Sequence, residues 1–159
     1  RFLELLDLVA ARGIDFELIL LGARGRSSES LDVIADRHRN RIVFNDYAED
    51  RAVYDRWLGR MDSVVSTADH EFFGIAICEA IWAGAIPLVP DRLSYVEFIP
   101  ECNRYGSLDQ AAEMIAVWES NRDCGSIQNE CRQRIAGFEI GKVTKTIDDR
   151  LVELTHDVA

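Results

Sequence analysis

The chain has 159 residues, which is one domain by length and enough to build a hydrophobic core. Its 18 basic and 28 acidic side chains give a formal net charge of −10, so we do not expect this chain by itself to grip a polyanion such as a nucleic acid. The four cysteines have no C-x-x-C spacing and the three histidines do not cluster, which argues against a zinc site. No signal peptide or membrane-length apolar run is present, and we expect a soluble, cytoplasmic protein with no membrane partner.

Hydrophobic spacing predicts helices that alternate with short strands along the first ninety residues. In chain order they are a helix over residues 2–13, a strand over 16–21, a helix from Ser27 or Ser28 to 37, a strand over 42–44, a helix over 49–60, a strand over 63–66, a helix over 74–84 and a strand over 86–89. This alternation indicates βαβ units and therefore an α/β fold, a Rossmann-like doubly wound parallel sheet.

After Pro90 the pattern changes to packing helices that carry no motif of their own. Ser107 and Gln110 have the spacing of a capping box, which predicts the start of a helix there. Two more helical stretches follow, over residues 126–135 and 142–154, and no linker or second domain is visible.

The predicted helix 74–84 is apolar on every side, which is typical of a helix in the interior of a protein. Its exception is Glu79, whose carboxylate would need hydrogen-bond donors from the protein or from a ligand. Glu71 lies eight positions earlier, in the loop before the helix. If Phe73 and Gly74 open the helix, their free N–H groups suit a phosphate. Glu79 would then lie roughly 8 Å further along the axis, near the ribose of the same nucleotide.

The spacing E-x7-E, written here as Glu71-FFGIAIC-Glu79, resembles the donor site of retaining glycosyltransferases of the two-domain GT-B type, close to family 4. The longer run STADHEFFGIAICEAIWAGAIPLVPDRLSYVEFIP is similar to a narrower group, the glycosyltransferase-like proteins that include tRNA-queuosine mannosyltransferases. The group's last segment usually reads L-x-Y-P-E, and Val96 replaces the proline here. The resemblance implies that Glu71 is the catalytic residue that orients the transferred sugar, that Phe72, Phe73 and Gly74 contact phosphate or sugar, and that Glu79 binds the ribose.

Two further strand ends could contribute to the same site, because ligands of open parallel sheets bind outside the carboxyl ends of the strands. Gly22 and Arg24 follow the first strand and could contact phosphate, or could form an ordinary turn with a solvated arginine. Asn45 and Tyr47 follow the second strand, and the resemblance implies that they bind the nucleobase. An ordinary Asx-type turn is the alternative for that loop.

Two other places near these strand ends carry candidate ligand contacts. His70, beside Glu71, could line the sugar pocket, although neighbouring loop residues often point apart. Ser94 and Tyr95 follow the fourth strand, where they could reach the donor or belong to a structural loop.

The resemblance implies transfer of mannose from GDP-mannose, with a queuosine-bearing tRNA as the acceptor. The sequence has no D-x-D pair that would suggest a metal site, and we expect no cofactor or metal. Helix N-termini and basic side chains would stabilise the leaving diphosphate.

Residues 1–159 are then one nucleotide-sugar-binding domain from a longer enzyme whose N-terminal acceptor-binding domain is missing, and we expect this piece alone to be inactive. The alternatives are a UDP-sugar transferase with another acceptor and a regulatory domain that binds a nucleotide without turnover. A dehydrogenase would need G-x-G-x-x-G after its first strand, which residues 22–25 do not supply.

Overall fold

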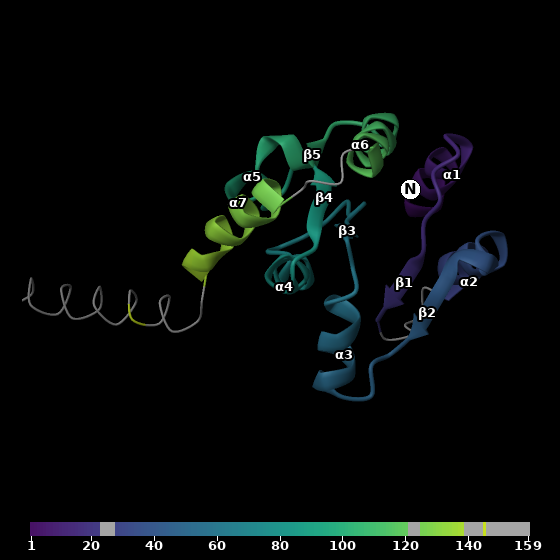
Figure 1. The fold of residues 1–159 in the computed structure, drawn as a ribbon, viewed down its shortest axis with the longest axis horizontal. Helices are drawn as coiled ribbons and strands as arrows, with labels where there is room; N and C mark the ends of the chain where they lie inside the picture. Colours follow the sequence, from purple (N-terminus) through teal and green to yellow (C-terminus); the bar gives the residue numbers. More distant parts are fainter. Residues whose placement is uncertain (23–27, 121–124, 139–144, 146–159) are drawn as a thin grey trace, which may run out of the picture.

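A computed structural model describes residues 1–22, 28–120, 125–138 and 145. The elements follow one another as α1 (Phe2–Ala11), β1 (Leu18–Leu21), α2 (Ser28–Arg37), η1 (Arg39–Arg41), β2 (Ile42–Asp46), α3 (Arg51–Leu58), β3 (Ser63–Val65), α4 (Ile75–Ala83), β4 (Ile86–Pro90), α5 (Tyr95–Phe98), η2 (Glu101–Asn103), β5 (Arg104–Tyr105), α6 (Leu108–Ser120), α7 (Gly125–Ile135) and η3 (Ala136–Phe138) (Figure 1). The predicted alternation of strands and helices is confirmed. The helix predicted over 142–154 lies, apart from residue 145, outside the described residues, as does Arg24.

Local sequence signals explain where several helices begin and end. The side chain of Asp50 accepts from the N–H of Val53 at 2.8 Å and caps α3. Ser107 accepts from the N–H of Gln110 at 3.2 Å at the start of α6, while the Gln110 side chain accepts from the N–H of Gly106 at 2.8 Å. The predicted capping box therefore forms, with its reciprocal bond directed one residue earlier.

The parallel strands that the sequence predicts form two hydrogen-bonded groups. β1 pairs with β2, and β3, β4 and β5 form a second sheet with β4 at its centre. Within the described ranges, no hydrogen-bonded ladder joins β1 to β3. The prediction of an α/β fold with parallel strands is thus confirmed. The grouping of the strands into two hydrogen-bonded sets was not predictable, because apolar runs specify strands without specifying their partners.

The two sheets also run in opposite senses (Figure 1). Arg12, which precedes β1, bonds Asp109, which follows β5, at 3.3 Å. At its other end β1 finishes at Leu21, which packs against a cluster holding Ala85, the residue before β4. The carboxyl ends of β1 and β2 therefore do not share an edge with the carboxyl end of β3, and the expectation that three strand ends meet at one edge is wrong.

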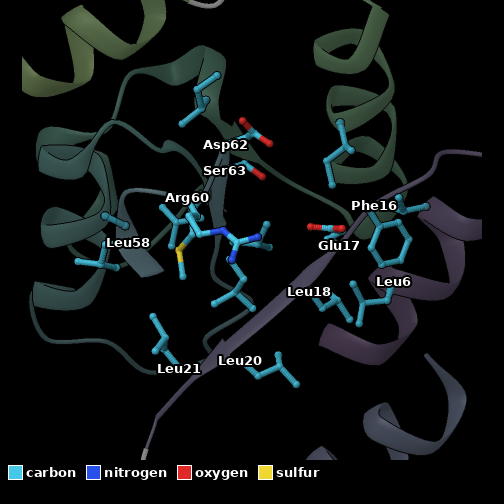
Figure 2. Close-up of a pocket in the computed structure, with 18 of the residues that line it drawn as sticks. Leu6, Phe16, Glu17, Leu18, Leu20, Leu21, Leu58, Arg60, Asp62 and Ser63 are labelled. Atoms are coloured by element: carbon cyan, nitrogen blue, oxygen red, sulfur yellow. The ribbon is translucent and has the colours of Figure 1, made fainter. Parts of the chain in front are cut away.

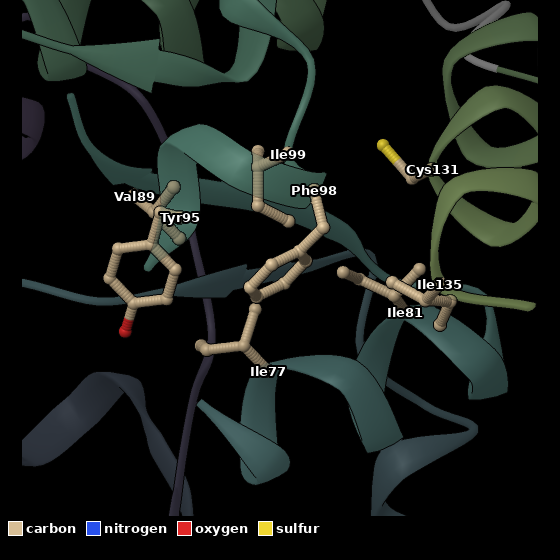
Figure 3. Packing of buried hydrophobic residues seen from close by; sticks show 8 residues of the cluster. All are labelled: Ile77, Ile81, Val89, Tyr95, Phe98, Ile99, Cys131 and Ile135. Carbon is tan, nitrogen blue, oxygen red and sulfur yellow. The ribbon is translucent and has the colours of Figure 1, made fainter. Parts of the chain in front are cut away.

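The hydrophobic core is centred on β4, which is buried along its whole length. Figure 3 shows its largest cluster, in which Phe98 of α5 lies between α4 and α7. The members are Ile77, Ile81, Val89, Tyr95, Phe98, Ile99, Cys131 and Ile135. Among the described helices, none is both long and apolar enough to cross a bilayer.

A cavity of about 1050 Å³ separates the two sheets. Figure 2 shows it between β1, with Leu18, Leu20 and Leu21, and the segment that leads into β3, with Arg60 and Asp62. Residues of α1, α4 and α6 line it as well. Its wall is made mostly of core side chains, and neither Glu71 nor Glu79 contributes to it.

Candidate functional site

The loop between β3 and α4 is shaped by a glycine. Gly74 is the N-cap of α4 and has φ = 85°, a left-handed conformation that favours glycine. A Cβ at this position would lie 3.0 Å from Cε1 of the Tyr95 ring. The chain therefore needs glycine here for its backbone angle and for the close approach of Tyr95. The first N–H groups of α4, like those of any α-helix, have no acceptor within the helix.

The buried side chain of Tyr95 packs against this loop. It is completely buried, and its hydroxyl donates to Oγ of Ser66, at the end of β3, at 3.0 Å. Burial raises the pKa of Tyr95, the hydrogen bond to Ser66 acts in the opposite direction, and the negative charge of Glu71 raises the pKa further. Of the two alternatives for Tyr95, a contact with the donor or a structural role in the loop, complete burial of the side chain favours the structural role.

The residues predicted to bind phosphate and sugar lie in this loop with different exposures. Glu71 is partly buried and its Oε1 accepts from the N–H of Phe72 at 3.0 Å. Phe72 itself is fully exposed, and His70 is exposed beside it. Phe73 turns inward, with its ring centroid 5.5 Å from that of Phe98 and 5.1 Å from that of Phe138. The backbone of Phe73 can still face a ligand, whereas its ring anchors the loop.

Helix α4 is buried on one face only, which corrects the expectation of an interior helix. Ile77, Ala80 and Ile81 are buried, but Ile75 is 68% and Trp82 63% exposed. The uniform apolar composition hid this division, because no polar face marks the solvent side.

Glu79 of α4 is held by two side chains of α3. Nη1 of Arg51 donates to Oε1 at 2.8 Å, and the hydroxyl of Tyr54 donates to Oε2 at 2.8 Å. The Glu79 side chain remains 29% exposed. Hydrogen-bond donors for its carboxylate thus come from the protein, which is one of the two sources that the sequence left open.

The electrostatics of this contact follow from its partial burial. The pKa of Tyr54 is raised to about 12, mainly by burial and then by its hydrogen bond to the Glu79 carboxylate. The same carboxylate, through its hydrogen bond, raises the pKa of Arg51. At neutral pH the contact therefore consists of a charged guanidinium and a neutral phenol, both donating to Glu79.

The predicted nucleobase residues lie at the end of β2, apart from the Glu71 loop. Asn45 is partly buried, and Tyr47 is 64% exposed. Gly22, at the end of β1, lies beside them, with its N–H 3.5 Å from the carbonyl oxygen of Asp46. The structure groups Gly22, Asn45 and Tyr47 at the ends of β1 and β2. Helix α3 follows this loop and carries Arg51 and Tyr54, the two side chains that hold Glu79.

Arg51 and Tyr54 are site residues that the sequence analysis missed. A signal for them exists, because Asp50 caps α3 and residues three apart on a helix lie on one face. That pattern shows that the two side chains point the same way, and only the packing of α3 on α4 shows that they meet Glu79.

Comparison with known proteins identifies the family. Residues 3–136 match the model of a family described as Family 4 Glycosyltransferase in conflict systems. Over 97 residues the chain is 35% identical to tRNA-queuosine alpha-mannosyltransferase of Drosophila melanogaster, an alignment that covers 60% of this chain and 26% of that protein.

Solved structures show the same fold at lower identity. Anabaena HepE, whose crystal structure is in complex with UDP, has a TM-score of 0.74 at 19% identity over 94% of this chain and 44% of its own. TarM has a TM-score of 0.74 at 18% identity over 96% of this chain and 31% of its own. The chain thus spans about a quarter of the curated relative and less than half of each solved neighbour. The fold is the Rossmann-like one of GT-B glycosyltransferases. With a family match that runs through most of its length, this chain belongs to the family 4 glycosyltransferases.

Proposed function

We propose that residues 1–159 form the nucleotide-sugar (donor) binding domain of a retaining glycosyltransferase. The observation that carries the proposal is the placement of Glu71 and Glu79 in a family 4 chain: one lies in the glycine-turned loop at the start of α4, the other on the partly exposed side of the same helix. Between them lie the free N–H groups of the helix start, which attract a diphosphate.

Each part of a nucleotide-sugar has a proposed partner. The start of α4, from Phe73 and Gly74, receives the diphosphate, and Glu79 accepts from the ribose hydroxyls. Glu71 orients the transferred sugar, with His70 and Phe72 beside it. Asn45 and Tyr47 receive the nucleobase. Gly22 lies beside them at the end of β1, away from the start of α4, so we assign it no contact with the diphosphate, and Arg24 lies outside the described residues.

The chemical contribution of these groups is electrostatic. Departure of a nucleoside diphosphate leaves negative charge on the phosphates, and N–H groups already aimed at that position stabilise it without reorganisation. The sugar, which gains oxocarbenium character, is stabilised by the Glu71 carboxylate. Retention of configuration, by attack on the face the diphosphate leaves, and the absence of a metal requirement remain predictions.

The names and ligands of the relatives support a more specific donor and acceptor. We infer GDP-mannose as the donor and a queuosine-bearing tRNA as the acceptor, supported by the name of the Drosophila relative. The bound UDP of HepE supports a UDP-sugar as the alternative donor. With a net charge of −10 this domain is a poor tRNA ligand, so the tRNA would be held by a separate acceptor-binding domain in a cytoplasmic enzyme, and the present domain alone would be inactive.

Calorimetry of the full-length protein with GDP-mannose, UDP-glucose and GDP tests the donor assignment. We expect Glu79→Ala to weaken binding about tenfold or more, because a carboxylate that accepts from hydroxyls contributes about 1.5 to 3 kcal/mol. Glu130→Ala is the matched control, since it removes a carboxylate from an exposed ion pair on α7. Equal affinity of Glu79→Ala and the parent would remove the ribose assignment.

A nucleotide-binding regulatory domain without turnover makes a different prediction. Slow hydrolysis of the donor by the full-length protein, lost in Glu71→Gln, supports the transferase. Binding without any hydrolysis or transfer would favour the regulatory domain.

A further inference from the structure

Among the described residues, Arg51 and Tyr54 occupy only part of the hydrogen-bonding capacity of the Glu79 carboxylate. A carboxylate has about four lone-pair sites, spread over two oxygens. Arg51 takes one site on Oε1 and Tyr54 one site on Oε2. Each oxygen can therefore accept one further hydrogen bond, and the exposure of the side chain leaves room for a ligand to donate it. A pair of neighbouring hydroxyls, as on a ribose, matches this arrangement of one acceptor site on each oxygen.

The two donors that hold Glu79 are themselves fixed by α3. Nε of Arg51 donates to Asp55 one turn along the helix at 2.7 Å, while its guanidinium carbon lies 5.2 Å from the centroid of the Tyr54 ring. Asp50 caps the same turn. A carboxylate on a long side chain normally samples several rotamers, and two bonds from a braced helix restrict it to one.

We propose that Arg51 and Tyr54 are positioning residues. They hold the Glu79 carboxylate where it accepts hydrogen bonds from both hydroxyls of the ribose, so the domain binds ribonucleoside diphosphates more tightly than their 2′-deoxy forms. The inference rests on the proposed function, because it requires Glu79 to face the ribose. It goes further by assigning the selection to two residues of α3.

Binding of GDP and 2′-deoxy-GDP to the full-length protein tests the inference, with UDP and 2′-deoxy-UDP used instead if calorimetry selects a uridine donor. We expect the parent to prefer the ribonucleotide about tenfold. In Tyr54→Phe and Arg51→Gln that preference falls below about threefold, because affinity for the ribonucleotide drops while affinity for the deoxy form stays the same. Arg51→Lys restores part of the preference, since it keeps a charged donor at the position.

The control is Arg134→Gln, which breaks an exposed arginine–glutamate pair on α7 and leaves the preference at its parental value. A merely structural role of Arg51 and Tyr54 would weaken both nucleotides equally, and that result overturns the inference. An unchanged preference in both variants overturns it too, while the ribose assignment of Glu79 stands. A parent that binds both nucleotides with equal affinity overturns the inference together with that assignment.

Discussion

Position 74, at the start of α4, has two structural requirements that only glycine meets. Its φ of 85° is a left-handed value, and a Cβ would lie 3.0 Å from the buried Tyr95 ring. We expect Gly74→Ala to lower the free energy of unfolding by about 1 to 3 kcal/mol, as measured by urea denaturation, through backbone strain and displacement of the ring.

Gly137→Ala is the comparison for that variant, because the backbone there has no left-handed φ and a Cβ would meet nothing within 4 Å. Equal stability of Gly74→Ala and Gly137→Ala would contradict the strained-cap interpretation.

Tyr54 makes the stability of the protein depend on pH at the alkaline end. Its pKa rises from 10.0 to about 12 on folding, first through burial and then through Glu79. Because the folded state holds the phenol proton more tightly, the stability that Tyr54 adds is complete below pH 10 and is lost as the pH rises through about 12. The difference in unfolding free energy between the parent and Tyr54→Phe should therefore shrink over this interval.

The raised pKa of Tyr105, also about 12, is common to both proteins and cancels in that difference. If the difference in unfolding free energy between the parent and Tyr54→Phe stays constant up to pH 12, folding does not raise the pKa of Tyr54.

Among the elements, α6 depends on its capping box. Ser107→Ala removes the acceptor for the N–H of Gln110 and should reduce the free energy of unfolding by about 1 kcal/mol in urea titrations. Ser120→Ala, at the other end of the helix, removes a bond to the carbonyl oxygen of Ala116 that already belongs to the helix, and should be close to neutral. A larger loss in Ser120→Ala than in Ser107→Ala would argue against the cap.

Local elements were predictable where a local signal exists. Capping residues, glycine stops and apolar runs mark β1 to β4, α6 and α7, and the structure places them within a few residues of the predicted bounds. β5 was missed because its two residues, Arg104 and Tyr105, form no pattern, and its pairing comes from β4 beside it. α5 was missed for a similar reason, since four residues are too few to show helical periodicity.

The candidate site was predictable in part. The loop with Glu71 and Gly74 carries its own signature, and the spacing to Glu79 follows from helix geometry. The contacts of Glu79 with Arg51 and Tyr54 depend on how α3 packs on α4, which joins residues 25 or more positions apart. Sequence patterns report on neighbours within one element, so this pairing could be found only in three dimensions.

At the scale of the whole molecule, the arrangement of the strands was the least predictable feature. Every strand is short and apolar, and nothing in such runs states which strand lies next to which. The structure separates β1 and β2 from β3, β4 and β5 and leaves a cavity of about 1050 Å³ between them.

That separation has a consequence for the behaviour of the isolated domain in solution. One edge of β1 and one edge of β3 have no hydrogen-bonded partner among the described strands. Such a free strand edge can pair with a strand from another molecule. The net charge of −10 opposes association, and its reach falls from about 10 Å in 0.1 M salt to about 3 Å in 1 M salt. Light scattering should therefore detect oligomers of the isolated domain that grow with added sodium chloride, and a monomer that persists at high salt would show that these strand borders are protected.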